Sequence, residues 1–244
     1  MTTTPLILFD IDGTLLRGGG IGRRTMAAAF KRVLGLGPGA DTSLASVPFH
    51  GNTDFAIIRD GLESMGFEVT DQRVDAILDC YLELIAKEVA TNNPFFALDG
   101  AVDHVERFTS AGVPMGLGTG NVESAAWLKV EAVGLRHHFG FGGFGSDHIE
   151  RSELLRIGWR RGAALHGRPP EAFRVLVIGD TIRDIDAAQR IGASVIAVAT
   201  GGDPLDVLAA RRPDHLVPTL SDPSVAPWVD RWLGRQLAGR IGAS

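Results

Sequence analysis

Two aspartates one residue apart, Asp10 and Asp12, follow a short apolar segment near the start of the chain. Residues 6–10 are typical of a strand buried on both faces, and Gly13 indicates a tight turn directly after it. Alternate side chains of a strand share a face, so both carboxylates are expected beside one crevice. There they could act as nucleophile, acid or base, or bind a cation. An ordinary Asp-Gly surface turn is the competing interpretation.

A hydroxyl side chain between two glycines follows a second apolar segment. Thr119 stands between Gly118 and Gly120, and Asn121 comes next, where a helix is expected to begin. Glycine lets a ligand approach the backbone closely, and free amides at a helix N-terminus bind anions. This pattern predicts a phosphate site at Thr119, although Asn121 could also serve only as the helix cap.

Two further aspartates follow another apolar segment, residues 175–180. Asp180 ends it, and Asp184 lies in the first turn of the expected next helix. The helix dipole alone would explain Asp184, because acids are favoured in the first turn. In an open parallel sheet, however, the carboxyl ends of the strands share one ligand-binding crevice. Hard oxygen ligands gathered in this way suit Mg²⁺.

The elements that must position these residues form an α/β pattern. Helical patterns separate most of the apolar segments, which favours a Rossmann-like parallel sheet in a three-layer α/β/α core. A further helix is expected over residues 226–237. The predicted strands cover residues 6–10, 113–119, 139–145, 175–180 and 194–199.

A helical insertion is expected directly after the first strand. Residues 17–96 contain no convincing strand, but helix-period segments cover residues 23–34, 53–65 and 71–90. Glycines at 18–20 and the Asn-Asn-Pro run at 92–94 are expected hinges. We therefore predict a core of residues 1–16 and 97–244 and a helical cap domain of residues 17–96, placed where a lid could cover the carboxylates.

Composition limits the classes of partner. The formal net charge of −5 argues against a nucleic-acid-binding protein, and no apolar run approaches the ~20 residues of a membrane span. The N-terminal sequence lacks the features of a signal peptide, and Cys80 has no second cysteine with which to form a disulfide. These features predict a cytoplasmic protein with no membrane partner; they assign no oligomeric state.

On these motifs the whole chain resembles the haloacid dehalogenase-like (HAD) superfamily of hydrolases. Residues 10–14 are similar to its first motif, in which the first Asp is the nucleophile and the second the general acid/base. Thr119 fits the second motif, which binds the transferring phosphoryl group. Residues 179–184 fit the fourth, whose acids hold Mg²⁺ with the first Asp. Residues 17–96 resemble the mobile cap, with residues 49–54 as the loop that phosphoglycolate-phosphatase-like members point at the substrate.

The third motif departs from the family pattern. The family has a lysine near the start of the helix after the third strand, whereas residues 145–154 contain none. Arg151 is the first choice for this cation, because arginine is always charged and binds phosphate oxygens with two donors. Lys129, on the helix after Thr119, is the alternative, and a solvent-exposed residue at a helix start is the competing interpretation of Arg151.

The resemblance implies a magnesium-dependent phosphatase that hydrolyses a small phosphorylated metabolite through an aspartyl-phosphate on Asp10. Phosphoglycolate, other small phosphomonoesters, sugar phosphates and nucleotides fit equally well. Asp12 would protonate the leaving alkoxide and then activate water, and its metal contact would be its main-chain carbonyl. The implied site residues are Asp10, Asp12, Thr119 and Arg151 for catalysis; Gly13, Gly120, Asn121, Thr53 and Asp54 for substrate binding; and Asp10, Asp12, Asp180 and Asp184 for the metal.

Alternative functions remain compatible with the same residues. A phosphomutase of the β-phosphoglucomutase type needs both acids of residues 10–14, and a non-catalytic phospho-binding module could keep the scaffold. A phosphorylation-dependent receiver domain would need neither a cap nor this length. The glycine pattern at 140–145 matches a dinucleotide-binding motif, but no strand is expected before it and no well-placed acid follows, so we interpret it as part of a glycine-rich strand.

Overall fold

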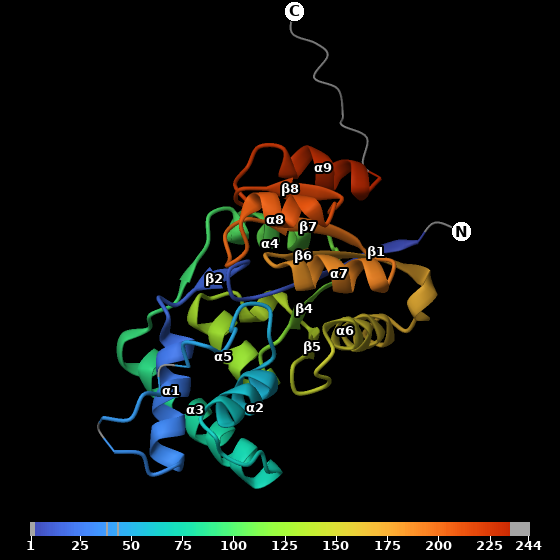
Figure 1. Ribbon diagram of the computed structural model, residues 1–244. Helices are drawn as coiled ribbons and strands as arrows, with labels where there is room; N and C mark the ends of the chain where they lie inside the picture. The colour runs from blue at the N-terminus through green and yellow to red at the C-terminus, as the bar shows by residue number, and fades with distance from the viewer. Residues whose placement is uncertain (1–2, 38, 43, 235–244) are drawn as a thin grey trace, which may run out of the picture.

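The computed structural model describes residues 3–37, 39–42 and 44–234, and its centre is a parallel sheet (Figure 1). The strand order is β5-β4-β1-β6-β7-β8, and every neighbouring pair is parallel. Because β1 lies between β4 and β6, the strands expected to carry the polar residues are neighbours. The strands are β1 (Thr4–Phe9), β4 (Met115–Thr119), β5 (Phe141–Phe144), β6 (Phe173–Gly179), β7 (Ser194–Val198) and β8 (His215–Val217).

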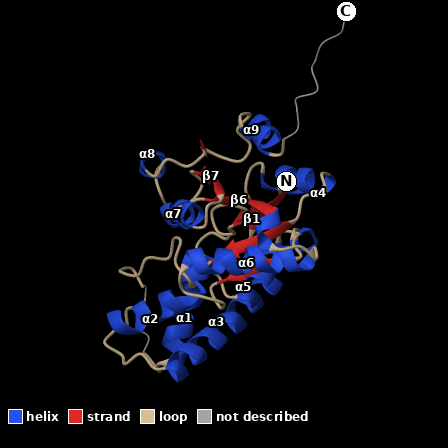
Figure 2. Cartoon of the chain, turned by 90° about the vertical axis from the view of Figure 1, so that its right-hand side faces the viewer, coloured by secondary structure: helices blue, strands red, loops and turns tan. Residues whose placement is uncertain are grey.

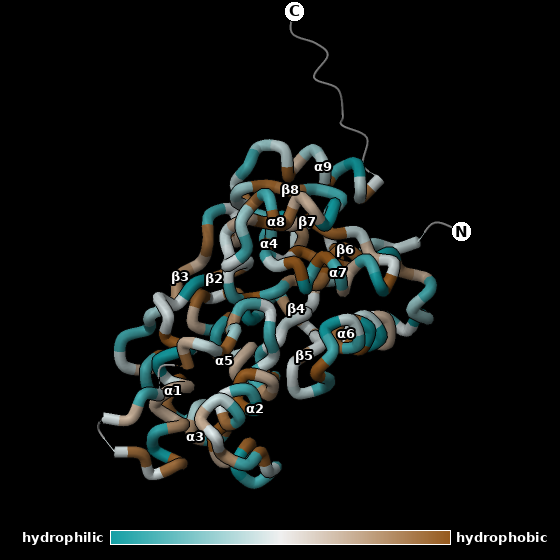
Figure 3. The backbone as a smooth tube through the Cα atoms, viewed as in Figure 1, coloured by the Kyte–Doolittle hydropathy of each residue, from teal (hydrophilic) through white to brown (hydrophobic). Residues whose placement is uncertain are grey.

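Helices cover both faces of the sheet, and Figure 2 shows the strands between them. The alternation of β1 divides the apolar core: Ile7 and Phe9 pack on one face, and Leu6 and Leu8 on the other. The first face is covered by α4 (Ala101–Ser110), α5 (Glu123–Ala132) and α9 (Val225–Trp232). The second is covered by α6 (Arg151–Leu165), α7 (Ile182–Arg190) and α8 (Leu205–Ala210). The tube in Figure 3 is brown along β6 and β7, as expected for strands buried on both faces.

Three helices leave the sheet after β1 and form a separate helical segment. They are α1 (Ile21–Val33), α2 (Asp54–Ser64) and α3 (Asp71–Asn92). Thr53 caps α2 by accepting a bond from the Ala56 N–H, and Thr70 caps α3 in the same way through Arg73. The segment begins and ends at a short antiparallel pair, β2 (Leu16–Arg17) with β3 (Phe96–Ala97). Figure 1 shows it beside the β4 and β5 end of the molecule.

The five predicted strands and the three helices predicted for the segment are confirmed. The prediction that residues 17–96 contain no strand is wrong at both ends, because Arg17 pairs with Phe96. Strand β8 and the β2–β3 pair were not predicted, since runs of two or three residues carry no readable periodicity. The last predicted helix, residues 226–237, is only partly correct: α9 ends at Trp232, and residues 235–237 lie outside the described residues. Within the described ranges, no helix is both long and apolar enough to cross a membrane.

Two short 3₁₀ helices complete the architecture. Arg136–His138 connects α5 to β5, and Pro170–Ala172 connects α6 to β6. Both are connections from a helix back to a strand at the edge opposite the carboxyl ends of the strands. The helical segment lies at the other edge, next to the carboxyl ends. Its boundaries as a domain, between residues 16 and 17 and between residues 96 and 97, remain a prediction.

Candidate active site

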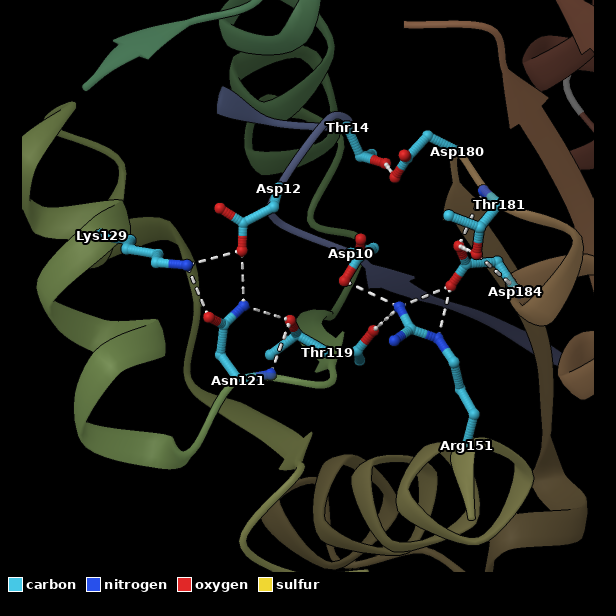
Figure 4. A network of polar contacts seen from close by, with 11 residues as sticks. Asp10, Asp12, Thr14, Thr119, Asn121, Lys129, Arg151, Asp180, Thr181 and Asp184 are labelled. Carbon is cyan, nitrogen blue, oxygen red and sulfur yellow. Dashed lines mark hydrogen bonds and ion pairs between the residues drawn. The ribbon is translucent and has the colours of Figure 1, made fainter. Parts of the chain in front are cut away.

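The polar residues predicted from the sequence meet at the carboxyl ends of three neighbouring strands (Figure 4). Asp10 follows β1 directly, Thr119 is the last residue of β4, and Asp180 follows β6. Since β1 pairs with both β4 and β6, these three residues come to one edge of the sheet. The residues of these strands that lead directly to the site are buried, so they hold these side chains on a rigid base.

Three buried carboxylates form the centre of the site. Asp10, Asp180 and Asp184 each offer an oxygen within 4.8 Å of the others. Their exposed fractions are 5%, 1% and 0%. Carboxylates this deeply buried are costly unless a cation or hydrogen bonds compensate their charge.

Arg151, the first residue of α6, supplies one compensating charge. Its Nη2 lies 2.8 Å from Asp10 Oδ1 and 2.6 Å from Asp184 Oδ1, and its Nε lies 2.7 Å from Asp184 Oδ1. The side chain is 7% exposed, so the interpretation of Arg151 as a solvent-exposed residue is wrong. The two carboxylates hold the pKa of Arg151 above its ordinary value in spite of its burial.

Local structure holds the two aspartates that follow β6. Asp184 accepts bonds from the Thr181 N–H at 3.0 Å and the Thr181 hydroxyl at 2.7 Å, as part of a capping box that begins α7. The Thr14 hydroxyl donates to Asp180 Oδ1 at 2.9 Å. A Cβ at Gly201 would overlap the Asp180 carboxylate, and one at Gly179 would overlap Asp184. Glycine is therefore required at both positions for the carboxylates to occupy this space.

The electrostatics of this cluster fit a bound cation. Burial raises the pKa of Asp10, and its carboxylate neighbours Asp184 and Asp12 raise it further, against the lowering effect of Arg151. Burial raises the pKa of Asp180 well above its ordinary value, with repulsion from Asp10 and Asp184 as the next causes. Three ionised carboxylates facing one guanidinium leave negative charge uncompensated. Oxygen ligands with excess negative charge fit a divalent metal ion.

Thr119 presents a hydroxyl whose proton is free for a ligand. Its Oγ1 accepts a bond from the Asn121 N–H at 3.3 Å and from Asn121 Nδ2 at 2.8 Å. A hydroxyl oxygen accepts through two lone pairs and donates one proton. With both lone pairs engaged, the hydroxyl can direct that proton at an oxygen of a bound anion.

The second acid of the first motif has a cation of its own. Lys129 Nζ, on α5, lies 2.7 Å from Asp12 Oδ2 and 2.6 Å from Asn121 Oδ1. The Asp12 side chain is half exposed, whereas Lys129 is buried. Asp12, Tyr81 and Asp54 hold the pKa of Lys129 above its ordinary value although burial opposes this. The two cations considered for the third motif thus contact different acids: Arg151 contacts Asp10 and Asp184, and Lys129 contacts Asp12.

The loop before α2 connects the helical segment to the site. The Asp54 N–H donates to the Gly120 carbonyl at 3.0 Å, and Asp54 Oδ2 accepts from the Val122 N–H at 2.8 Å. A Cβ at Gly120 would overlap the Asn52 carbonyl, which explains the glycine after Thr119. The buried Asp54 carboxylate therefore binds the loop that leads into α5.

This carboxylate gives a prediction for stability as a function of pH. Burial raises the pKa of Asp54 to about 6, so the folded state binds a proton more tightly than the unfolded chain. Ionisation between pH 4 and 6 therefore costs the wild type roughly 2–3 kcal/mol of unfolding free energy, a cost that Asp54→Asn does not carry. We expect the stability of Asp54→Asn relative to wild type to rise by that amount over this range in urea titrations. A difference that stays constant with pH would contradict the raised pKa.

A cavity of about 460 Å³ lies between the strand ends and the helical segment. Most of the predicted site residues line this cavity. Its lining does not include Gly13, Thr53, Asp180 or Asp184. The helical segment adds Arg23 and Tyr81 to the walls, and neither was predicted; it also adds His50, from the loop of residues 49–54 that the resemblance placed next to the substrate. The predicted residues that line it are Asp10, Asp12, Asp54, Thr119, Gly120, Asn121 and Arg151, together with the alternative cation Lys129.

Two predicted substrate residues have roles within the protein. Gly13 has a φ of +87°, and a Cβ there would lie 2.6 Å from an Asp180 oxygen. Thr53 caps α2. Thr14 and Thr181 orient the acidic cluster but were not predicted as site residues. Thr181 directly follows Asp180, and only Gly13 separates Thr14 from Asp12, so their places in the sequence could have indicated them.

The chain is similar to known proteins along most of its length. Residues 4–192 match the family model of the haloacid dehalogenase-like hydrolases. The chain is 28% identical over 231 residues to a probable phosphatase, IndB, of Dickeya dadantii (89% of this chain and 91% of the relative). It is 25% identical over 217 residues to a phosphoglycolate phosphatase of Mesorhizobium japonicum (81% and 83%).

A solved structure shares the fold. The crystal structure of CbbY from Rhodobacter sphaeroides in complex with phosphate superimposes with a TM-score of 0.70 at 18% sequence identity, covering 91% of this chain and 96% of that one. The family match extends from β1 through α7 and includes the strand ends that carry Asp10, Thr119 and Asp180. The chain belongs to the haloacid dehalogenase-like hydrolase family.

Proposed function

We propose that this hydrolase is a magnesium-dependent phosphatase of the phosphoglycolate phosphatase type, which transfers the phosphoryl group of a small phosphomonoester to Asp10 and then to water. The observation that carries the proposal is the meeting of Asp10, Asp180, Asp184 and Arg151 beside a cavity that Asp12 and Thr119 also line. The phosphatase names of the relatives support the same activity.

The carboxylates of Asp10, Asp180 and Asp184 would hold Mg²⁺. Asp12 would contribute its main-chain carbonyl, because its carboxylate is bound by Lys129 and Asn121. When bound, the ion would neutralise the repulsion between the nucleophile and an anionic phosphate. Thr14 and Thr181 donate hydrogen bonds to Asp180 and Asp184 and would keep these carboxylates oriented for the ion.

Asp10 would act as the nucleophile. Its carboxylate oxygen forms a bond to phosphorus while the bond from phosphorus to the leaving oxygen breaks. Asp12 gives its proton to that oxygen, then takes a proton from the water that attacks the phosphoryl group and releases Asp10. Thr119 donates its free proton to a phosphoryl oxygen. Arg151 adds charge stabilisation through Nη1, the guanidinium nitrogen with no hydrogen bond to any described residue.

The helical segment would serve as the cap that closes this cavity. Its loop of residues 49–54 contacts the Thr119 loop, and Gly202 lies against His50. A cavity of about 460 Å³ suits a small metabolite, so we propose a phosphorylated metabolite rather than a protein or nucleic acid as the substrate.

A panel of phosphate esters tests this proposal. We expect release of inorganic phosphate from at least one small ester with Mg²⁺, and loss of that release when EDTA removes the metal. The panel should include phosphoglycolate, sugar phosphates, nucleotides and 4-nitrophenyl phosphate. Isomerisation of a sugar phosphate without net phosphate release would show a phosphomutase, and binding without turnover of any ester would show a phospho-binding module; either result would overturn the proposal.

A further inference from the structure

We propose that Lys129 is a positioning residue for Asp12: it holds Oδ2 in place and leaves Oδ1 free for proton transfer to the leaving group. This inference rests on the proposed function, because it needs Asp12 to be the acid. It concerns a different residue from the phosphate-binding cation, since Arg151 is the cation next to the nucleophile.

Two donors converge on the same oxygen of Asp12. Lys129 Nζ lies 2.7 Å from Oδ2 and Asn121 Nδ2 lies 2.8 Å from it, whereas Oδ1 has no hydrogen bond to any described residue. The carbonyl oxygen of a neutral carboxyl group also accepts hydrogen bonds, so Oδ2 can keep both contacts when the group carries its proton. The exchangeable proton is thereby assigned to Oδ1.

Asn121 joins this acid to the phosphate-binding hydroxyl. Its Oδ1 accepts from Lys129 at 2.6 Å, and its Nδ2 donates to both Asp12 Oδ2 and Thr119 Oγ1. Figure 4 shows Lys129, Asn121, Asp12 and Thr119 as one continuous set of contacts, apart from the Arg151 contacts. Loss of the Lys129 ammonium would remove one contact of the Asn121 amide and one of the Asp12 carboxylate together, and only the bond from Asn121 Nδ2 would still hold that carboxylate.

Lys129 itself is held rigidly. Its side chain is only 5% exposed, on a helix whose neighbouring residues Ala125, Ala126 and Val130 are in the core. The Asp12 side chain, in contrast, is half exposed and would have alternative rotamers without its partner. A displacement of about 1 Å at a reacting group can cost on the order of 10²-fold in rate, so fixing this carboxylate matters for the chemical step.

The dependence of rate on the leaving group distinguishes this role from a structural one. An alkyl phosphate needs a proton on its leaving oxygen, whereas 4-nitrophenolate leaves without one. We therefore expect Lys129→Met to lower kcat/KM for the best alkyl ester of the panel by roughly 10²-fold, and for 4-nitrophenyl phosphate by less than about 5-fold. Lys129→Arg should recover most of the alkyl-ester activity, because it restores a cationic donor.

Three further variants complete the experiment. Lys87→Met removes an exposed lysine on α3 and should leave both rates unchanged. Asp12→Asn should show the same preference for the aryl ester as Lys129→Met; if it does not, the proposed acid role of Asp12 is wrong. Lys129→Gln keeps a hydrogen-bond donor and serves if Lys129→Met does not fold by circular dichroism. Equal losses for both esters in a folded Lys129 variant, with Asp12→Asn behaving as expected, would overturn the positioning role.

Discussion

Asn in place of Asp10 is expected to lower the turnover of phosphate esters by about four orders of magnitude or more, because an amide is too weak a nucleophile to form the covalent bond to phosphorus. Removal of an enzymatic nucleophile has effects of this size. The Asn side chain keeps an oxygen for Arg151 Nη2, so the surroundings of residue 10 should survive. Single-turnover and steady-state rates of the Asp10→Asn variant measure the loss.

The stability of this variant should move in the opposite direction to its activity. Burial and the neighbouring carboxylates Asp184 and Asp12 raise the pKa of Asp10 against the lowering effect of Arg151, so its ionisation costs more free energy in the folded chain than in the unfolded one. Thermal unfolding of Asp10→Asn should therefore occur at the wild-type temperature or above it. Asp75→Asn, an exposed residue of α3, is the matched control and should affect neither quantity. Full phosphatase activity of Asp10→Asn would contradict the nucleophile assignment.

Replacement of Asp180 by Asn should raise the Mg²⁺ concentration needed for half-maximal activity by at least the ~10–100-fold that loss of an outer-shell partner costs in metal sites. The change removes one charge from the three-carboxylate cluster while leaving an oxygen for the Thr14 hydroxyl. Activity titrated against Mg²⁺ gives the midpoint, and high Mg²⁺ should restore part of the rate.

Asp206→Asn on α8 is the control for this second substitution, because that carboxylate is exposed and lies outside the cluster. Its Mg²⁺ midpoint should equal that of the wild type. An Asp180→Asn variant with a wild-type midpoint would show that the aspartate after β6 does not hold the metal.

Much of the fold was predictable because long apolar runs and amphipathic periods are local signals. The segment around Leu8 is apolar on both faces of the sheet, and α3 repeats Val74, Ile77 and Tyr81 on one face. Strand β8 could not be predicted, since His215–Val217 is too short for a pattern and its pairing with β7 is a long-range contact.

The meeting of the residues at the strand ends was also predictable, because the carboxyl ends of neighbouring parallel strands lie at the same edge of the sheet. Asp10, Thr119 and Asp180 needed only that strand order to come together. Asp184 is held by the capping box at the start of α7, which is a local sequence feature. In that position its carboxylate lies close to Asp10.

The contacts of Lys129 and Asp54 could not be predicted from the local sequence. Helix α5 has apolar residues on nearly all sides, so no pattern showed that Lys129 points toward Asp12. Asp54 reaches Val122 only because α2 docks on the loop after β4, a contact between residues far apart in the sequence. The directions of such side chains depend on tertiary packing.

The proposed mechanism requires Asp10 and Asp180 to share one divalent cation. The anomalous signal of Mn²⁺ in crystals of the protein measures this directly, since Mn²⁺ binds the same hard oxygen ligands as Mg²⁺. We predict one peak within roughly 2.0–2.6 Å of a carboxylate oxygen of each of these aspartates. A peak bound to Asp10 with Asp180 beyond coordinating distance, or no peak at this cluster, would contradict the account.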